Sequence, residues 1–125
     1  MEINKILSLE TIVSDLKVSG KKHLFQELSQ KASGIVGIKD RIILRTLLDR
    51  EKLGTTGIGQ GVAIPHGKIS ELKNSIGFFA RLIEPIDFEA VDEKPVDLIF
   101  LLLAPEDASS ENLKTLAKVS RMLRD

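Results

Sequence analysis

Two long apolar runs restrict the folds open to this chain more than any other feature. The segments "SIGFFARLI", residues 75–83, and "VDLIFLLLA", residues 96–104, are almost continuously hydrophobic. Such runs are typical of strands that are buried on both faces and covered by helices. Pro85 follows the first run, and Pro95 and Pro105 flank the second, so the intervening "IDFEAVDEK" is expected to be a loop or a short edge hairpin.

Helical patterns surround these runs. A short first strand is expected over 11–18. Two helices follow: Ser19 caps the first, which Gly34 and Gly37 end, and Asp40 caps the second, which Gly54 stops. A last helix is expected with Ser109 or Ser110 as its cap. Two helices precede the two strongest strands, so the pattern is not a strict alternation of strand and helix. The sequence therefore predicts an α/β fold, a single-domain sandwich over residues 1–125 in which helices flank a mixed β-sheet.

Composition excludes several classes of function. Eighteen Lys and Arg residues balance eighteen Asp and Glu residues, which gives no electrostatic reason to expect nucleic acid or an anionic membrane as partner. The absence of cysteine excludes disulfides, zinc–thiolate sites and thiol nucleophiles. The longest apolar run, 98–104, is far shorter than the roughly 20 residues that span a bilayer. The N-terminus lacks the pattern of a signal peptide, so a cytoplasmic location is expected.

The glycine-rich segment "GTTGIGQGVAIPHGK", residues 54–68, fits none of the common ligand-binding motifs. Its glycines read G-x-G-x-G rather than the dinucleotide-binding G-x-G-x-x-G, and a proline follows where a helix should begin. A P-loop is excluded because Val62 stands where its first glycine should be and Ile69 follows Lys68. His66 and His23 are far apart in the sequence and no acidic residue lies close to His66, so neither a metal site nor a cofactor is expected.

The same segment holds one histidine in a constrained backbone. Pro65 fixes its own φ and favours extended geometry before it, which is expected to place His66 near a strand end. Arg50 closes the preceding helix and can reach towards the same place, and Thr56 brings a hydroxyl. A neutral imidazole is a good nucleophile, and a guanidinium, hydroxyls and glycine amides can stabilise a phosphoryl group in transfer.

Other interpretations of these residues stay open on this reasoning alone. A lone histidine in a Gly/Pro turn is commonly a turn residue bonded to the backbone. Arg50 can equally be a cation that complements the dipole at the end of its helix, and Thr56 can equally be an ordinary turn residue. His23 is expected to be solvated, and the cluster "DREK", residues 49–52, to be an exposed helix face.

The run "LLDREKLGTTGIGQGVAIPHGKI" resembles the signature of the enzyme IIA domains of the fructose/mannitol class of the phosphotransferase system. It is most similar to the stand-alone nitrogen-regulatory IIA proteins. The resemblance extends through "FFARLIEPIDFEAVDEKPVDLIFLLLAPE" and the helix from Asn112, and so covers nearly the whole chain. It implies the mannitol-type IIA fold, a mixed sheet between helices, in agreement with the pattern of apolar runs.

The resemblance also implies a function. His66 would be the residue phosphorylated by a phosphohistidine carrier of the HPr or NPr type, with Arg50 and Thr56 in the active site. Such a IIA protein is a cytoplasmic phosphocarrier, a histidine phosphotransferase without cofactor. Its phosphoryl group would pass to a IIB protein in sugar transport, or its state would be signalled to regulatory targets such as kinases or potassium transport proteins.

Two departures from the family pattern bear on this expectation. The family commonly has a second active-site histidine where this chain has Asn112, and asparagine can hydrogen-bond a phosphate but cannot carry a proton or a positive charge. Family members also usually continue with a further helical segment beyond "RMLRD", whose absence is expected to favour self-association. A regulatory phosphocarrier is thus the first expectation, a sugar-specific IIA component the second, and a transfer-deficient interaction module the third.

Overall fold

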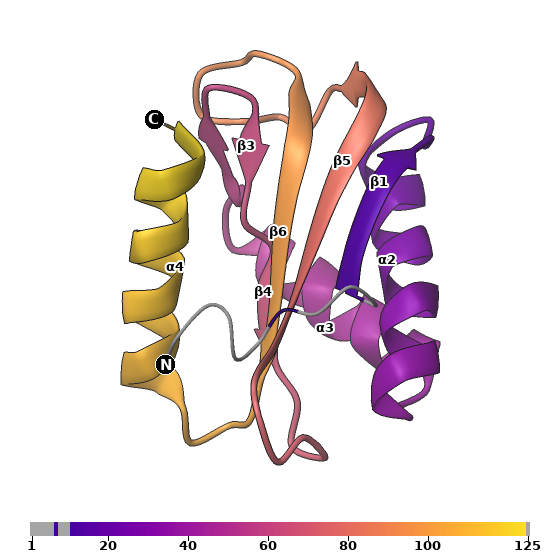
Figure 1. Cartoon of the computed structure of the whole chain (residues 1–125), viewed down its shortest axis with the longest axis vertical. Helices are drawn as coiled ribbons and strands as arrows, with labels where there is room; N and C mark the ends of the chain where they lie inside the picture. The colour runs from indigo at the N-terminus through magenta and orange to yellow at the C-terminus, as the bar shows by residue number, and fades with distance from the viewer. Residues whose placement is uncertain (1–6, 8–10, 125) are drawn as a thin grey trace.

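The structure is a computed structural model that describes residue 7 and residues 11–124. Helices cover both faces of a single mixed sheet (Figure 1). In chain order the elements are β1 (Ile12–Leu16), α2 (Lys21–Val36), α3 (Asp40–Lys52), β2 (Gly57–Gly59), β3 (Val62–Ala63), β4 (His66–Lys68), β5 (Ile76–Ile86), β6 (Val96–Ala104) and α4 (Ser109–Arg124). This architecture confirms the predicted mixed sheet flanked by helices.

The two apolar runs form the centre of the sheet. Strands β5 and β6 pair antiparallel, with Phe79 opposite Phe100. Strand β1 adds to β5 in parallel on one side, and β3 and β4 pair in parallel with successive parts of β6 on the other. Strand β2 then pairs antiparallel with β3. The glycine-rich segment thus supplies three short strands, two next to β6 and β2 beside β3, which the sequence pattern did not predict.

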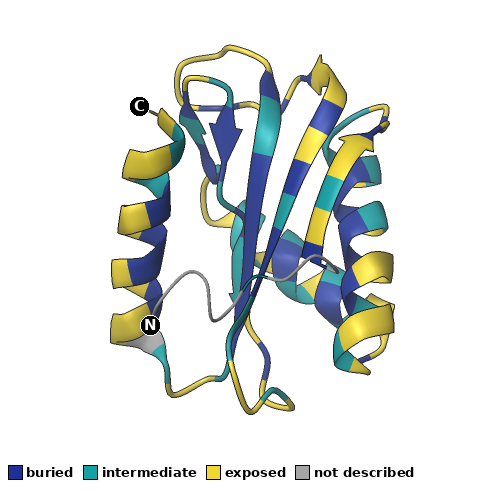
Figure 2. Ribbon diagram, in the orientation of Figure 1, coloured by how far each residue is buried: buried dark blue, intermediate teal, exposed yellow. Residues whose placement is uncertain are grey.

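Strand β6 is hydrophobic throughout because both of its faces are covered. Ile99, Leu101 and Leu103 belong to the large core beneath α2 and α3. Phe100 and Leu102 pack in a second, smaller core with residues of α4. Figure 2 shows β6 buried along most of its length, whereas the outer strand β1 is largely exposed. The alternation of side chains along a strand explains how one continuous apolar run serves both cores.

The predicted helix caps are wrong at two positions. Gly20, not Ser19, occupies the N-cap of α2, and the backbone N–H of Ser19 instead donates to Nδ1 of His23 at 3.0 Å. Lys39 is the N-cap of α3, so Asp40 lies in the first turn, where its charge still favours the helix dipole. Helix α2 ends at Gly37 in the left-handed conformation, as predicted, with Gly34 inside the helix.

The segment between β5 and β6 is a loop that folds over the glycine-rich hairpin. Phe88 and Ala90 are buried, and the N–H of Val91 donates to the carbonyl of Gly57 at 3.0 Å. A β-carbon on Gly57 would lie 2.8 Å from that of Ala90, so only glycine allows this approach. The loop therefore packs against β2 instead of forming an edge hairpin.

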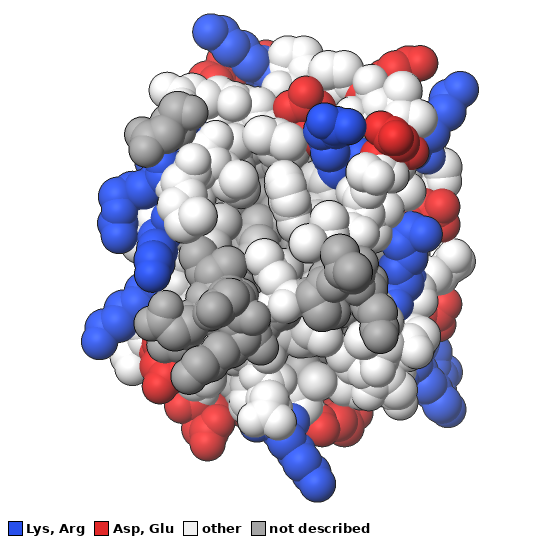
Figure 3. Space-filling model, viewed as in Figure 1, with Lys and Arg blue, Asp and Glu red and all other residues white. Residues whose placement is uncertain are grey.

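The surface carries charges of both signs. On the face seen in Figure 3 acidic and basic side chains alternate around the rim, and Lys and Arg gather along the flank formed by α4. Within residues 11–124, no helix is both long enough and apolar enough to cross a membrane.

Candidate active site

His66 is the first residue of β4, a strand that pairs with β6 through His66 opposite Leu102. The next residue, Gly67, faces α3 so closely that a β-carbon there would lie 2.6 Å from Cγ2 of Thr46. Because successive side chains of a strand point to opposite faces, His66 lies on the other face, the one that α4 covers. The expected position of His66 at a strand end is confirmed.

Two hydrogen bonds define the state of the imidazole. Nδ1 of His66 lies 2.9 Å from the carbonyl oxygen of Ile64. A carbonyl only accepts, so Nδ1 carries the proton and donates it. Nε2 is then unprotonated, and its lone pair accepts a hydrogen bond from the Nε–H of Arg50 at 3.3 Å. The nitrogen available as a nucleophile is therefore Nε2, and it faces a guanidinium.

The surroundings keep this ring neutral. Burial lowers the pKa of His66 below its ordinary value of 6.5, and the positive charge of Arg50 lowers it further. The hydrogen bond to Ile64 and the negative charge of Glu51 act in the opposite direction and only partly offset this effect. At neutral pH the imidazole therefore has a lone pair on Nε2 rather than a second proton.

Arg50 is itself held in place. Its Nη1 donates to the carbonyl oxygen of Gly54 at 2.9 Å, so the end of α3 and the turn that follows hold the guanidinium beside His66. Arg50 was predicted to reach towards His66, and the structure brings the two together.

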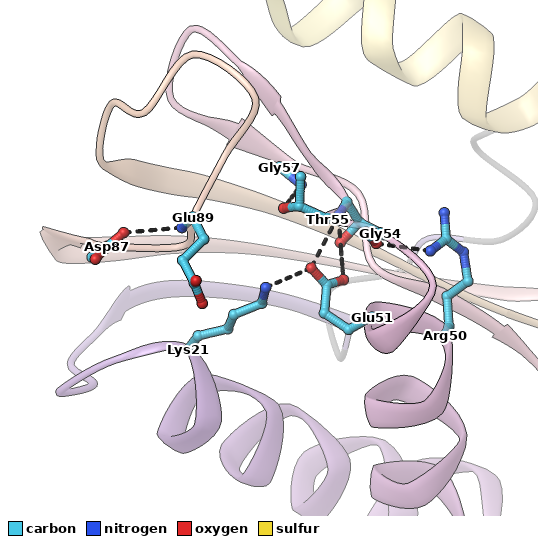
Figure 4. A network of polar contacts seen from close by, with 9 residues as sticks. Lys21, Arg50, Glu51, Gly54, Thr55, Gly57, Asp87 and Glu89 are labelled. Atoms are coloured by element: carbon cyan, nitrogen blue, oxygen red, sulfur yellow. Dashed lines mark hydrogen bonds and ion pairs between the residues drawn. The ribbon is translucent and has the colours of Figure 1, made fainter.

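A buried ion-pair network lies next to this site (Figure 4). Glu51 accepts hydrogen bonds from the backbone N–H of Thr56 at 3.0 Å and from its hydroxyl at 2.6 Å. The ammonium group of Lys21 lies 2.6 Å from the same carboxylate, whose side chain is only 7% exposed. The expectation that residues 49–52 form an exposed face is therefore wrong for Glu51. No local pattern indicates its burial, because its partners come from α2 and from the turn after α3.

Thr56 is connected to His66 through the backbone rather than through its hydroxyl. Its carbonyl accepts the N–H of Ile64 at 2.9 Å, and the carbonyl of Ile64 in turn accepts from the His66 ring. The hydroxyl, which was expected to stabilise a phosphoryl group, donates to Glu51.

Asn112 lies in the first turn of α4 and is buried. Within the described residues its Oδ1 has no hydrogen-bond partner, and neither does the hydroxyl of Thr115 one turn further on. Among the described contacts, no hydrogen bond joins the Asn112 side chain to His66. Nor does the described part of the chain hold three or more His, Cys, Asp or Glu side chains grouped as metal ligands.

The chain is similar to curated and solved proteins over nearly its whole length. It is 53% identical over 125 residues to the nitrogen regulatory protein of Bradyrhizobium diazoefficiens, covering 100% of this chain and 82% of that protein. The crystal structure of nitrogen regulatory protein IIA-Ntr from Neisseria meningitidis, 44% identical, matches 98% of this chain and 84% of that one with a TM-score of 0.94.

A more distant structure agrees in fold. IIA mannitol from Escherichia coli matches with a TM-score of 0.73 at 21% identity, over 90% of this chain and 81% of that one. The model of one family, described as "Phosphoenolpyruvate-dependent sugar phosphotransferase system, EIIA 2", matches residues 5–125. The chain therefore belongs to the EIIA 2 family of the phosphoenolpyruvate-dependent sugar phosphotransferase system.

Proposed function

We propose that this protein accepts a phosphoryl group on Nε2 of His66 from a phosphohistidine carrier of the HPr type and signals its phosphorylation state to regulatory partners. The observation that carries the proposal is the contact between Arg50 and His66, in which a guanidinium faces the unprotonated nitrogen at 3.3 Å. A nucleophile and a cation that can neutralise the incoming phosphoryl oxygens thus lie in one place.

The transfer needs no net proton movement. The hydrogen bond of the Arg50 Nε–H passes from Nε2 to the incoming phosphoryl oxygens, and the lone pair of His66 Nε2 attacks phosphorus in line. A new P–N bond forms, and the P–N bond of the donor breaks with its electron pair returning to the donor nitrogen. The proton on Nδ1 stays in its hydrogen bond to the Ile64 carbonyl. Arg50 stabilises the charge on the equatorial oxygens, because phosphoryl transfer depends mainly on alignment and electrostatics.

Asn112 is the remaining residue of the proposed site. It lies on the face of the sheet to which His66 points, and its side-chain amide carries donors suited to phosphoryl oxygens. Its Oδ1 has no hydrogen-bond partner within the described residues. Because Oδ1 is an acceptor, the proposed contact with phosphoryl oxygens is through the Nδ2–H donors. Asn112 would bind the phosphoryl group without supplying the positive charge of a histidine.

A regulatory role is favoured over sugar transport by the relatives. The proteins that are 53% and 44% identical to this chain are both named nitrogen regulatory proteins. Phosphorylation would add about −1.5 to −2 units of charge at a half-buried site, which is enough to change the partners that a surface binds. The regulatory target would then distinguish the two forms by this charge.

Intact-mass spectrometry tests the proposal. The protein is incubated with phosphoenolpyruvate, enzyme I and the HPr-type carrier, beside the variants His66→Ala, His23→Ala and Asn112→His. One acid-labile phosphate is expected on the wild type and on His23→Ala, and none on His66→Ala. Labelling of His66→Ala at the wild-type level would place the phosphate elsewhere. An unlabelled wild type beside a labelled Asn112→His would instead identify a transfer-deficient interaction module.

A further inference from the structure

Lys21 and Glu51 are each placed where their charge works against their own helix. Lys21 is the first residue of α2, whose first turn contains no acidic residue, and Glu51 lies in the last turn of α3. Helix N-termini favour anions and C-termini favour cations, so both positions are unfavourable. Burial of the carboxylate adds a desolvation penalty. The helices themselves therefore do not explain why this pair is present.

A continuous series of bonds leads from this pair to the imidazole. Lys21 pairs with Glu51 at 2.6 Å, and Glu51 accepts both the N–H and the hydroxyl of Thr56. The Thr56 carbonyl then accepts the N–H of Ile64 at 2.9 Å. The carbonyl of that residue accepts the Nδ1–H of His66, also at 2.9 Å. Each step is one hydrogen bond or one residue of backbone.

The start of this series is anchored by packing. The ammonium group of Lys21 lies 4.5 Å from the centre of the Phe88 ring, and that ring packs edge-on against Phe25 of α2 in the core. A cation over an aromatic face is attracted to it, and burial strengthens the attraction. Figure 4 shows Lys21 reaching from the start of α2 towards Glu51 at the end of α3. The carboxylate is thus fixed from two sides.

We propose that the Lys21–Glu51 pair is a positioning device for His66. It fixes Thr56, and through the Ile64 peptide it sets the carbonyl that holds the proton on Nδ1 and leaves the lone pair on Nε2. Arg50 and Glu51 are neighbours in one helical turn. That turn therefore supplies both the guanidinium that faces Nε2 and the carboxylate that, through Thr56 and Ile64, orients the Nδ1 side of the ring. The effect on phosphoryl transfer rests on the proposed function, whereas the effect on the ring does not.

The tautomer of His66 separates this role from a purely structural one. A pair that only ties α2 to α3 would change the free energy of unfolding and leave the ring as it is. A positioning pair also determines which ring nitrogen carries the proton, because the Ile64 carbonyl moves when Thr56 is released. Nitrogen-15 NMR of the imidazole distinguishes the two tautomers directly.

The experiment compares wild type with Glu51→Gln, Thr56→Val and Thr56→Ser by imidazole nitrogen-15 NMR and by the rate of phosphorylation with phosphoramidate. Glu51→Gln and Thr56→Val are expected to show mixed tautomers and rates lower by up to about a hundredfold, the range that small misplacements cause. Thr56→Ser keeps the hydroxyl and is expected to retain both wild-type properties.

Asp49→Asn is the matched control. Asp49 pairs with Lys52 at 3.8 Å in the same helical turn, but both side chains are well exposed, so the same loss of charge should change neither readout. If Glu51→Gln does not fold, Thr56→Val makes the same test with the carboxylate in place. Wild-type tautomer and rate in a folded Glu51→Gln or Thr56→Val would overturn the inference. A wild type that the phosphorylated HPr-type carrier does not label, with tautomers that shift as expected in the variants, would reject the proposed function and leave the inference about the ring standing.

Discussion

Gly67 lies against Thr46 with no room for a side chain: a β-carbon at Gly67 would be 2.6 Å from Cγ2 of Thr46. This contact brings β4 onto α3 immediately beside His66. The hydroxyl of Thr46 is meanwhile bonded to the carbonyl of Ile42 at 2.8 Å, so the methyl group cannot rotate away without breaking that bond. The precise approach of strand and helix therefore depends on glycine.

Gly67→Ala is expected to lower the free energy of unfolding by about 1–3 kcal/mol, the usual effect of overpacking. Thr46→Ser removes the obstructing methyl group and keeps the hydroxyl bond, so it should relieve most of this loss in the double variant. Urea unfolding of both single variants and the double variant measures the coupling. Equal effects of Gly67→Ala in the two backgrounds would show that the clash with Thr46 is not the cause.

Arg50→Ala is expected to slow single-turnover phosphoryl transfer from phosphorylated HPr by about 10²–10³-fold, as for the loss of one preorganised donor at a developing charge. Arg50→Lys should restore only part of the rate, because an ammonium cannot present the planar guanidinium that contacts both His66 and Gly54. Arg45→Ala, an exposed arginine of the same helix, serves as control. Wild-type transfer by Arg50→Ala would exclude the proposed role.

The pH dependence of His66 follows from its lowered pKa. An NMR titration of the ring should give a midpoint below 6.5, and Arg50→Ala should move the midpoint upwards because a positive charge is removed. The unfolded chain binds this proton at higher pH than the folded chain does. Stability from this group is therefore complete above pH 6.5 and is lost as the pH falls towards the folded pKa. A midpoint at or above 6.5 in the wild type would contradict this.

Asn112→Leu separates folding from function at α4. Because Oδ1 is buried without a partner, an apolar side chain of similar size should leave the free energy of unfolding unchanged or raise it by about 1 kcal/mol. Phosphoryl acceptance should nevertheless decrease if Asn112 binds the phosphoryl group. Thr115→Val removes the second unpartnered buried group of α4 and should be similarly stable with wild-type transfer. Full activity of Asn112→Leu would remove Asn112 from the proposed site.

The sequence predicted most where physical signals are local. Continuous apolar runs indicated strands buried on both faces, and β5 and β6 are those strands. The sequence also predicted that Arg50 can reach His66, and the end of α3 and the short β2–β3 hairpin that separate them fold back to bring the two together. Hydrophobic periodicity could not reveal the burial of Glu51, which depends on Lys21 in another helix and on a turn that folds back. The predicted caps Ser19 and Asp40 are wrong for a similar reason, since packing sets where the chain enters each helix.

The parallel pairing of β1 with β5 joins Ile12 to Phe79. During synthesis, Ile12 leaves the ribosome long before its partner strand exists. Helices α2 and α3 are also made before most of the sheet that they cover. Contacts so distant in sequence are reached late, because closing the loop between them must precede any gain from pairing. The first strand made is therefore expected to be among the last to dock. A nascent chain stopped before residue 76 would present the apolar faces of both helices to chaperones.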